Sequence, residues 1–518
     1  MMTLQRNSAN QLLRIELPVC ILIVSIHAYA LLVFGATFWI DSRDYVSLAT
    51  AIGSPDGIQT FYGTVGQWVF SHLGPGVPIL WLSIDELPVS WQWPVLAMFQ
   101  HALAAAALIV AFRMISRLWP SPVHIVSTLL LLLLPAYQSF HNALLTESCT
   151  SSLALIGFSC CVNIVRGGPN VKRNVVFVLG VIVFITQFRS YWGAIVASML
   201  FCSLITQRLL FSRWTLVLFA ISAISTLLFP AYRYAQTGQF FLPSGGINLL
   251  ISGSQANRAP SIEVTRLFDR AGLPPTLEPS DMLRRGVTMD DALKIAEKWR
   301  SDGLSNAEIN QRSWKLARAL GWDGLGVQSN KILYGMASIG AILPVMLLPE
   351  RHEVFPAYSP RMFFDHLYSY YLWQSWTDSD YRTIFERFFG PSSDAEAAVF
   401  PFGGSSNAKI YAAFGQHIST FDARLRDPLY LGRSPPDFWL MLALIGVGIL
   451  VIRARSVGIL LLCAVLPAFA VAYEFPLGNP RYSVPLLPLY FIVTSISFTY
   501  PINGLLRKLG VKAAGHAA

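Results

Sequence analysis

Long apolar runs alternate with short polar stretches along most of the chain. A helix needs about 20 mostly apolar residues to cross a bilayer, and ten runs reach or approach that length. They are residues 16–39, 94–116, 122–138, 148–165, 174–189, 191–207, 214–231, 437–452, 456–473 and 483–500. We therefore expect an all-α polytopic membrane protein with about ten transmembrane helices.

One long stretch, residues 232–436, interrupts this pattern with signals typical of soluble helices. Ser305 and Glu308 have the spacing of an N-terminal capping box, and Ile309 and Leu316 follow at helical spacing. Two further apolar stripes have the same period: Met289, Leu293, Ala296 and Trp299, and Val264, Leu267, Phe268 and Ala271. We expect a small helical domain that lies over the membrane.

This pattern divides the chain into three parts. Residues 1–231 form an N-terminal transmembrane module of about seven spans, 232–436 the loop domain, and 437–518 a C-terminal module of about three spans with a basic tail. Residues 332–348 are apolar but contain two glycines and a proline. A crossing there would move every later loop to the opposite side of the membrane and would put Arg453 and Arg455 on the non-cytoplasmic side. We therefore interpret this segment as non-spanning.

Basic residues predict the orientation, because they fall on every second loop or terminus. They are Arg6, Arg14, Arg113, Arg117, Arg166, Lys172, Arg173, Arg208, Arg213, Arg453, Arg455, Arg507, Lys508 and Lys512. Positively charged loops stay on the cytoplasmic side. Both termini are therefore expected in the cytoplasm, and the loop after the first span on the opposite face.

Composition supports a membrane protein, since 54% of the 518 residues are hydrophobic and only 13% are charged. The net charge of +9 is explained by the topology, so we expect membrane lipids and no nucleic acid as partners. The six cysteines lie in or beside apolar runs without metal-ligand spacing, and we expect neither a metal nor a cofactor. The first run is too long for a cleaved signal peptide. With no disulfide framework, a bacterial cytoplasmic (inner) membrane fits best.

Candidate functional residues gather on the non-cytoplasmic loops. They are Asp41, Arg43, Asp44, Tyr45, His141, Glu147, Arg189, Arg233, Arg481 and Tyr482. Acidic, cationic and aromatic groups from five loops are thus expected to lie at the same face of the membrane. Such a composition is expected where a lipid-borne anion meets a polar acceptor.

Each candidate also has a structural interpretation. Asp41 and Asp44 fit a solvated helix start, where carboxylates complement the helix dipole, and Arg189 and Arg481 fit interfacial anchors. Glu147 heads an apolar run, so it requires a water-filled cavity or an arginine partner. His27 and His101, inside predicted spans, are expected to be satisfied core residues.

The order of these motifs resembles the GT-C superfamily of membrane glycosyltransferases, which use polyprenyl-phosphate sugars. The likeness is greatest to the branch that holds the lipid A aminoarabinose transferase and the lipopolysaccharide-core galacturonosyltransferases, related to the protein O-mannosyltransferases. The matching pieces are Asp41-Ser-Arg-Asp-Tyr45, Gly74-Pro-Gly-Val-Pro78, His141-Asn-Ala-Leu-Leu-Thr-Glu147, Pro230-Ala-Tyr-Arg233 with Gly238 and Gly245-Gly-Ile-Asn248, and Pro480-Arg-Tyr-Ser-Val-Pro485. Two positions depart from the family pattern: Ser42, where many relatives have Glu, and Val77, where the turn usually has Tyr.

The resemblance implies an inverting transfer of a sugar from a polyprenyl-phosphate donor to a cell-envelope acceptor, such as lipid A or lipopolysaccharide core, on the periplasmic face. It places the catalytic base at Asp41, with Asp44 as a second catalytic carboxylate. The remaining candidates, Arg43, Tyr45, His141, Glu147, Arg189, Arg233, Arg481 and Tyr482, are then predicted to bind substrate.

Two alternatives remain open. An O-antigen-type ligase would depend on residues of the large loop, namely Arg351, His352, Arg361 or His366. A transporter or flippase of lipid-linked sugars would move substrate without making a glycosidic bond. No internal repeat or pair of interrupted helices supports the transporter.

Overall fold

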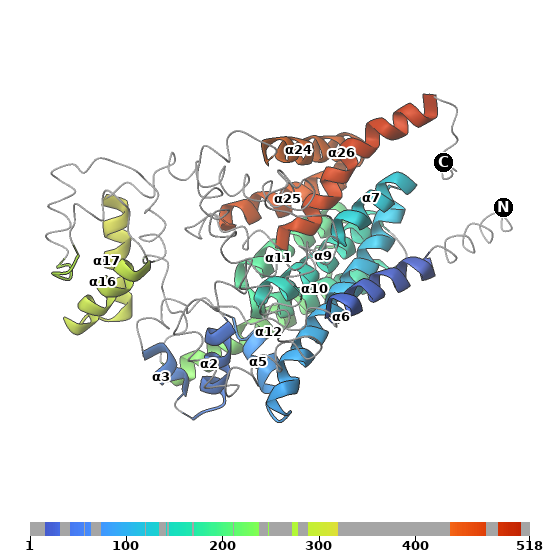
Figure 1. The fold of residues 1–518 in the computed structure, drawn as a ribbon. Coiled ribbons are helices and arrows are strands. Elements are labelled where there is room, and N and C mark those ends of the chain that lie inside the picture. Colours follow the sequence, from blue (N-terminus) through green and yellow to red (C-terminus); the bar gives the residue numbers. More distant parts are fainter. Residues whose placement is uncertain are drawn as a thin grey trace, which may run out of the picture.

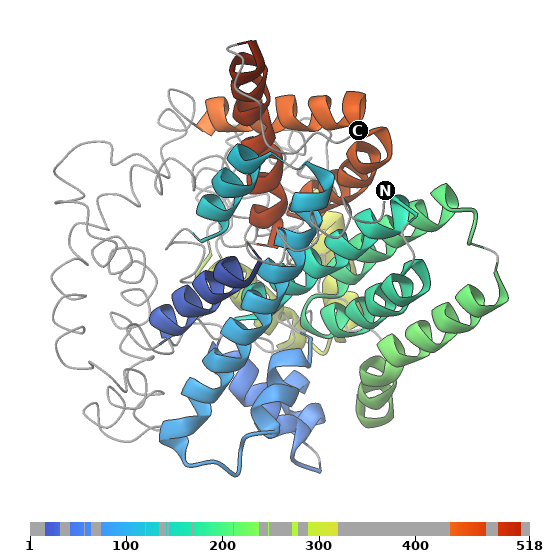
Figure 2. The same cartoon turned by 90° about the vertical axis from the view of Figure 1, so that its right-hand side faces the viewer.

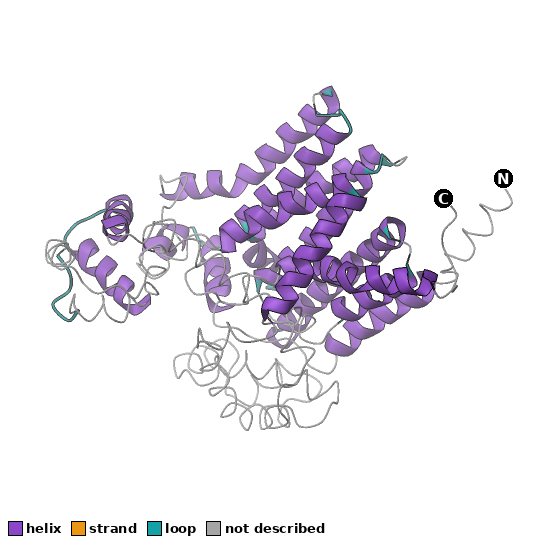
Figure 3. Ribbon diagram, turned by 90° about the horizontal axis from the view of Figure 1, so that it is seen from above, coloured by secondary structure: helices purple, strands orange, loops and turns teal. Residues whose placement is uncertain are grey.

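The computed structural model describes residues 16–31, 42–55, 57–63, 74–119, 121–133, 141, 145–167, 170–210, 212–237, 247, 272–277, 289–319, 436–472 and 485–508. Every regular element in these ranges is a helix, as Figure 3 shows, and none is a strand. The predicted all-α class is therefore confirmed for the described part of the chain.

The helices follow one another with short connections through most of the chain (Figure 1). After a first helix, Glu16–Leu31, they are α2 (Ser42–Ile52), α3 (Gly57–Gly63), α5 (Gly76–Leu82), α6 (Val89–Leu118), α7 (Pro122–Leu132), α9 (Thr146–Val165), α10 (Val171–Phe188), α11 (Ser190–Thr206), α12 (Arg213–Thr237), α16 (Met289–Ser301), α17 (Asn306–Ala319), α24 (Pro436–Arg453), α25 (Arg455–Ala472) and α26 (Leu487–Lys508).

Among the described helices, five are long and apolar enough to cross a membrane, within α6, α9, α10, α12 and α26. Four shorter apolar helices also fall in predicted spans: Glu16–Leu31, Pro122–Leu132, Trp192–Thr206 and Leu442–Arg453. The chain is thus a helical protein with several candidate membrane spans. The number of ten crossings stays a prediction.

Helix α9 lies at the centre of the apolar bundle, where it packs against α6, α10 and α11. It buries 17 of its 20 residues, although many of them are serine, threonine or cysteine. Hydroxyl groups are accommodated there because they bond to their own helix: Ser152 Oγ donates to the Ser148 carbonyl at 2.9 Å, and Ser159 Oγ to the Leu155 carbonyl at 2.7 Å. Small side chains also let neighbouring helices approach closely.

The basic helix ends lie together at one end of the bundle. Arg166 donates to the Arg117 carbonyl, which joins the ends of α9 and α6. At the same end, Gln207 donates to the Val165 carbonyl at 2.8 Å, and Arg453 donates to the Tyr500 hydroxyl at 2.7 Å. This arrangement is consistent with the predicted positive-inside orientation, since these side chains all belong to loops predicted to be cytoplasmic.

Helix α12 lies at the edge of the bundle (Figure 2) and leaves most of its apolar side chains exposed, among them Leu216, Ile224 and Leu228. It continues past Pro230 to Thr237, whereas the sequence predicted an end at 231. A proline is tolerated inside a membrane helix because neighbouring groups can satisfy the freed backbone carbonyl. Arg233 therefore lies on α12 and not in the loop that follows.

Two helices of the predicted loop domain are described, α16 and α17, and they pack together to one side of the apolar bundle (Figure 1). The capping box is confirmed: the Ser305 N–H donates to Glu308 Oε2 at 2.8 Å, and the Glu308 N–H donates to Ser305 Oγ at 3.4 Å. Trp299 and Ile309 are buried in a hydrophobic cluster that also contains Leu48 of α2 and Ile58 of α3. The segment 332–348 and the stripe that begins at Val264 lie outside the described residues.

Candidate active site at the polar end of the bundle

The predicted site residues are described to different extents. Tyr45, His141, Glu147, Arg189 and Arg233 have described side chains. Arg43 and Asp44 lie in the first turn of α2, which begins at Ser42. Asp41, Arg481 and Tyr482 lie outside the described residues, as do the loop residues of the ligase alternative, Arg351, His352, Arg361 and His366.

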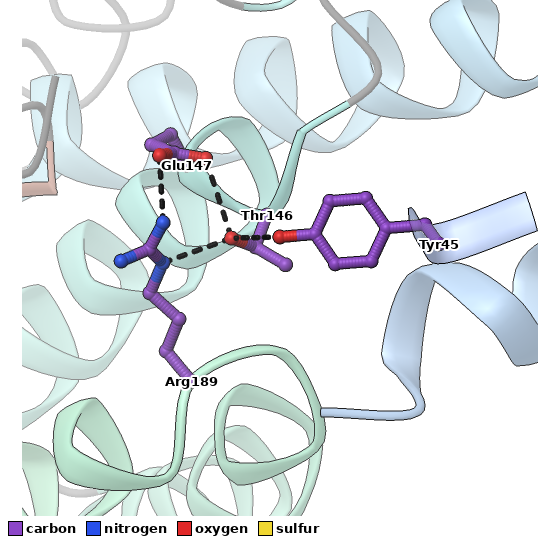
Figure 4. Close-up of polar contacts among 4 residues, drawn as sticks. All are labelled: Tyr45, Thr146, Glu147 and Arg189. Atoms are coloured by element: carbon purple, nitrogen blue, oxygen red, sulfur yellow. Dashed lines mark hydrogen bonds and ion pairs between the residues drawn. The ribbon is translucent and has the colours of Figure 1, made fainter. Parts of the chain in front are cut away.

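Four residues from three segments form one polar network (Figure 4). Arg189 forms an ion pair with Glu147, with 2.6 Å between the guanidinium nitrogen and Oε1. Arg189 Nε also donates to Thr146 Oγ1 at 2.8 Å, and Thr146 Oγ1 donates to Glu147 Oε2 at 3.3 Å. The Tyr45 hydroxyl lies 3.2 Å from the same threonine oxygen. A hydroxyl has one proton and two acceptor sites, so Thr146 is fully satisfied when Tyr45 is the donor.

The network is almost completely removed from solvent. Glu147 is 0% exposed, Tyr45 and Thr146 are each 1% exposed, and Arg189 is 8% exposed. A buried carboxylate is tolerated only when it is paired and hydrogen-bonded. The sequence predicted that Glu147 needs a cavity or an arginine partner, and the structure identifies that partner as Arg189.

Local backbone structure places both charges. Glu147 occupies the first turn of α9, where its negative charge complements the positive end of the helix dipole. Arg189 is the single residue between α10 and α11 and has an extended backbone, with φ −148° and ψ 106°. This sharp corner falls where the sequence predicted one span to end at residue 189 and the next to begin at residue 191. It directs the arginine side chain to the start of α9.

The glycine-proline turn at 74–78 packs on the same corner. A Cβ atom on Gly74 would lie 1.9 Å from the Gln187 carbonyl oxygen, and one on Gly76 would lie 2.8 Å from the Phe188 ring. Only glycine allows this approach of one backbone to another. Three pieces of the predicted motif order therefore meet here, namely the segment with Tyr45, the turn at Gly74 and the segment that ends at Glu147, and Arg189 joins them.

Arg233 is buried but belongs to a different part of this end. It lies on α12 and is 7% exposed. Its neighbour Tyr232 donates its hydroxyl to the Ile52 carbonyl at 3.4 Å, which links α12 to the last turn of α2. Whether Arg233, Tyr45, Glu147, Arg189 or His141 binds substrate stays a prediction.

A second polar group lies beside α9 and was not predicted as a cluster. It comprises His27, His101 and His141, from the first helix, α6 and the loop before α9; we call it the three-histidine cluster. The ring centroids lie 5.3, 5.4 and 5.8 Å apart, and the Nδ1 atoms of His27 and His101 lie 3.0 Å apart. The three residues are far apart in sequence, so no local pattern could have shown that they meet.

Among the described residues, no group of three or more histidine, cysteine, aspartate or glutamate side chains is arranged to hold a metal ion. The imidazoles of the three-histidine cluster contact one another and Ser148. The carboxylate of Glu147 is occupied by Arg189 and Thr146.

Comparison with protein-family models, with curated proteins and with solved structures gives no match for this chain.

Proposed function

We propose that the chain is an inverting glycosyltransferase that moves a sugar from a polyprenyl-phosphate donor to a cell-envelope acceptor. The observation that carries the proposal is the convergence of Tyr45, Gly74, Glu147 and Arg189 at one end of an apolar helical bundle. Tyr45, Gly74 and Glu147 belong to separate motifs, and the order of these motifs along the sequence is what resembles the GT-C superfamily. That end lies opposite the basic helix ends, which fits a periplasmic site reached by a lipid-borne donor.

The proposed role of the buried network is to hold the catalytic segment. Tyr45 lies four residues after Asp41, and its hydroxyl bond to Thr146 ties the first turn of α2 to the start of α9. Arg189 and Glu147 fix Thr146 in turn. A catalytic carboxylate must be placed within hydrogen-bond reach of its substrate, and a buried, fully satisfied network gives such rigidity.

The proposed reaction uses Asp41 as a general base. Its carboxylate takes the proton of the acceptor hydroxyl while that oxygen attacks the anomeric carbon. A new carbon–oxygen bond forms on one face of the sugar, and the bond from the anomeric carbon to the phosphate oxygen breaks on the other. The electron pair leaves with the polyprenyl phosphate. Of the arginines predicted to bind substrate, Arg189 is paired with Glu147, so in this proposal Arg233 and Arg481 stabilise the phosphate charge. Membrane lipids surround the prenyl tail, and each buried methylene contributes about 0.8 kcal/mol.

Asp41→Asn tests this role, because asparagine is isosteric but cannot accept the proton. General-base catalysis contributes about 10²- to 10⁴-fold, so transfer to the acceptor in membranes should fall by that factor while the amount of inserted protein is unchanged. Asp44→Asn is the matched comparison three residues away and should retain more activity. Full activity of Asp41→Asn would remove the proposed base.

One observation favours a second candidate, a transporter of lipid-linked sugars. Ionisable pairs buried in a membrane bundle often mark a substrate or proton pathway, and Glu147–Arg189 is such a pair. A transporter predicts flux of the lipid-linked sugar across sealed vesicles with no change in its chemical bonds. Formation of a glycosidic product in the same vesicles favours the transferase.

A further inference from the structure

The three-histidine cluster adjoins the Glu147–Arg189 pair through one hydrogen bond. His141 Nδ1 lies 2.8 Å from Ser148 Oγ, and Ser148 is the residue after Glu147 in the first turn of α9. Gln100 on α6 donates to the His141 carbonyl at 3.2 Å, so both the backbone and the ring of His141 are held. A displacement of His141 therefore acts directly on the turn that carries Glu147.

The cluster is also a place where charge is unfavourable. His27, His101 and His141 are 2%, 3% and 0% exposed. Burial is the main cause that holds the pKa of His141 well below its ordinary value of 6.5, and the neighbouring His27 and His101 lower it further. On α9, Glu147 and the buried thiol of Cys149 flank Ser148, and the Glu147 carboxylate is already paired with Arg189.

We propose that the three-histidine cluster positions the Glu147–Arg189 pair: His141 holds the first turn of α9 through Ser148, and the pair keeps its geometry only while the cluster is uncharged. His141 is then a positioning residue. The proposal concerns regulation of the same site and rests on the proposed function only for its effect on transfer.

The direction of the pH effect follows from burial. A histidine that is buried neutral binds its proton more weakly in the folded state than in the unfolded state. Its contribution to stability is complete above pH 6.5 and declines as the pH falls below that value. We therefore expect the Glu147–Arg189 pair to loosen only at a pH well below 6.5, where His141 takes up a proton despite its lowered pKa.

Labelling of Glu147 with dicyclohexylcarbodiimide, read by mass spectrometry on the full chain in detergent, reports the pair without any transfer assay. This apolar reagent reacts with a protonated carboxyl group, so a paired, ionised Glu147 is protected. Arg189→Met is the positive control for exposure of the carboxyl group. At pH 7.5 we expect Ser148→Ala and His141→Gln to increase labelling about 2- to 10-fold, the range that one net hydrogen bond allows.

Two matched variants separate positioning from general loss of structure. His141→Asn keeps an amide near the position of Nδ1, so it should retain the Ser148 bond and protect Glu147 better than His141→Gln does. His124 on α7 is another buried histidine, and its Nδ1 lies 2.9 Å from a serine, Ser495 Oγ on α26, and not from a residue of α9. His124→Gln should leave Glu147 labelling unchanged.

The outcomes distinguish this inference from the proposed function. Increased labelling in Ser148→Ala and His141→Gln, with transfer reduced in parallel, supports both. Increased labelling in a protein that shows no transfer in any form supports positioning and contradicts the transferase. Equal labelling in Ser148→Ala, His141→Gln and the wild type overturns the positioning role, whatever the transfer assay gives.

Discussion

Thr146 is the residue on which the polar network depends, because its hydroxyl joins all three segments. It accepts from Arg189 and Tyr45 and donates to Glu147. A single hydroxyl thus satisfies groups from α2, α9 and the corner between α10 and α11. Charge-assisted hydrogen bonds are stronger than neutral ones, so Arg189 and Glu147 dominate the energetics of the network and Tyr45 adds the connection to α2.

Removal of one charge of the Glu147–Arg189 pair should destabilise the protein more than removal of both. Arg189→Met leaves the Glu147 carboxylate buried without its cation, and breaking such a pair costs about 3–5 kcal/mol. The double variant Arg189→Met with Glu147→Gln leaves no unpaired charge and should recover part of that loss. Equilibrium unfolding in mixed detergent micelles measures the difference. Equal stability of the single and double variants would mean that the pair is not buried as described.

The sequence was sufficient to identify Glu147 as a residue that needs a partner, since an unpaired carboxylate at the head of an apolar run is unfavourable. It did not identify the partner, because Arg189 is 42 residues away and several arginines were candidates. The same limit applies to His27 and His101. Their burial was expected from the apolar runs around them, but contact with His141 depends on how three segments pack.

At the scale of the helix, the two predictions from sequence with clearest local signals are confirmed. The capping box of α17 has both of its reciprocal hydrogen bonds, and the corner at Arg189 separates α10 from α11. Helix ends were less predictable, since α12 continues past Pro230 and α6 begins at Val89, before the apolar run at 94. Past Pro230, α12 meets α2 where the Tyr232 hydroxyl donates to the Ile52 carbonyl, a contact that local composition does not show.

The cap on α17 offers a test at this scale. Ser305→Ala removes the side chain that receives the Glu308 N–H, and loss of an N-cap serine costs about 1 kcal/mol. Hydrogen bonds from Ser305 lower the pKa of Glu308, so the cap is complete above pH 4.5 and weakens as the pH falls below it. At pH 7, hydrogen exchange of the first-turn amides of α17 should be about fivefold faster in Ser305→Ala than in the wild type, which is the factor that corresponds to about 1 kcal/mol. An unchanged exchange rate would contradict the cap.

The turn at Gly74 offers a second test. Gly74→Ala forces the Gln187 carbonyl away from its place, and overpacking of this kind costs about 1–3 kcal/mol. Gly180 on α10 is the matched control, because a Cβ atom there meets nothing within 4 Å, and alanine is favoured over glycine in a helix by about 0.8–1 kcal/mol. Thermal unfolding in detergent should show a lower midpoint for Gly74→Ala and an equal or higher midpoint for Gly180→Ala. A higher midpoint for both would show that the turn does not pack on the corner.

For the whole molecule, the important feature is that the two ends of the apolar bundle carry different polar groups. At one end, exposed arginines lie at the ends of helices, as at Arg117, Arg166 and Arg453. The other holds the buried network and the start of α2. This polarity was predicted from the spacing of basic residues. Under the predicted orientation, the proposed chemistry lies on the face where lipid-linked sugars, and not nucleotide sugars, are the available donors.

The most direct test of the proposed transfer is mass spectrometry of the envelope glycolipids and glycans from cells that lack the chain, carry the wild type, or carry Asp41→Asn at equal amounts in the membrane. We predict that one envelope glycan or glycolipid gains the mass of a single glycosyl residue with the wild type, and that this form is absent with the deletion and with Asp41→Asn. Identical glycan masses in the deletion and the wild type would contradict the proposed glycosyltransferase.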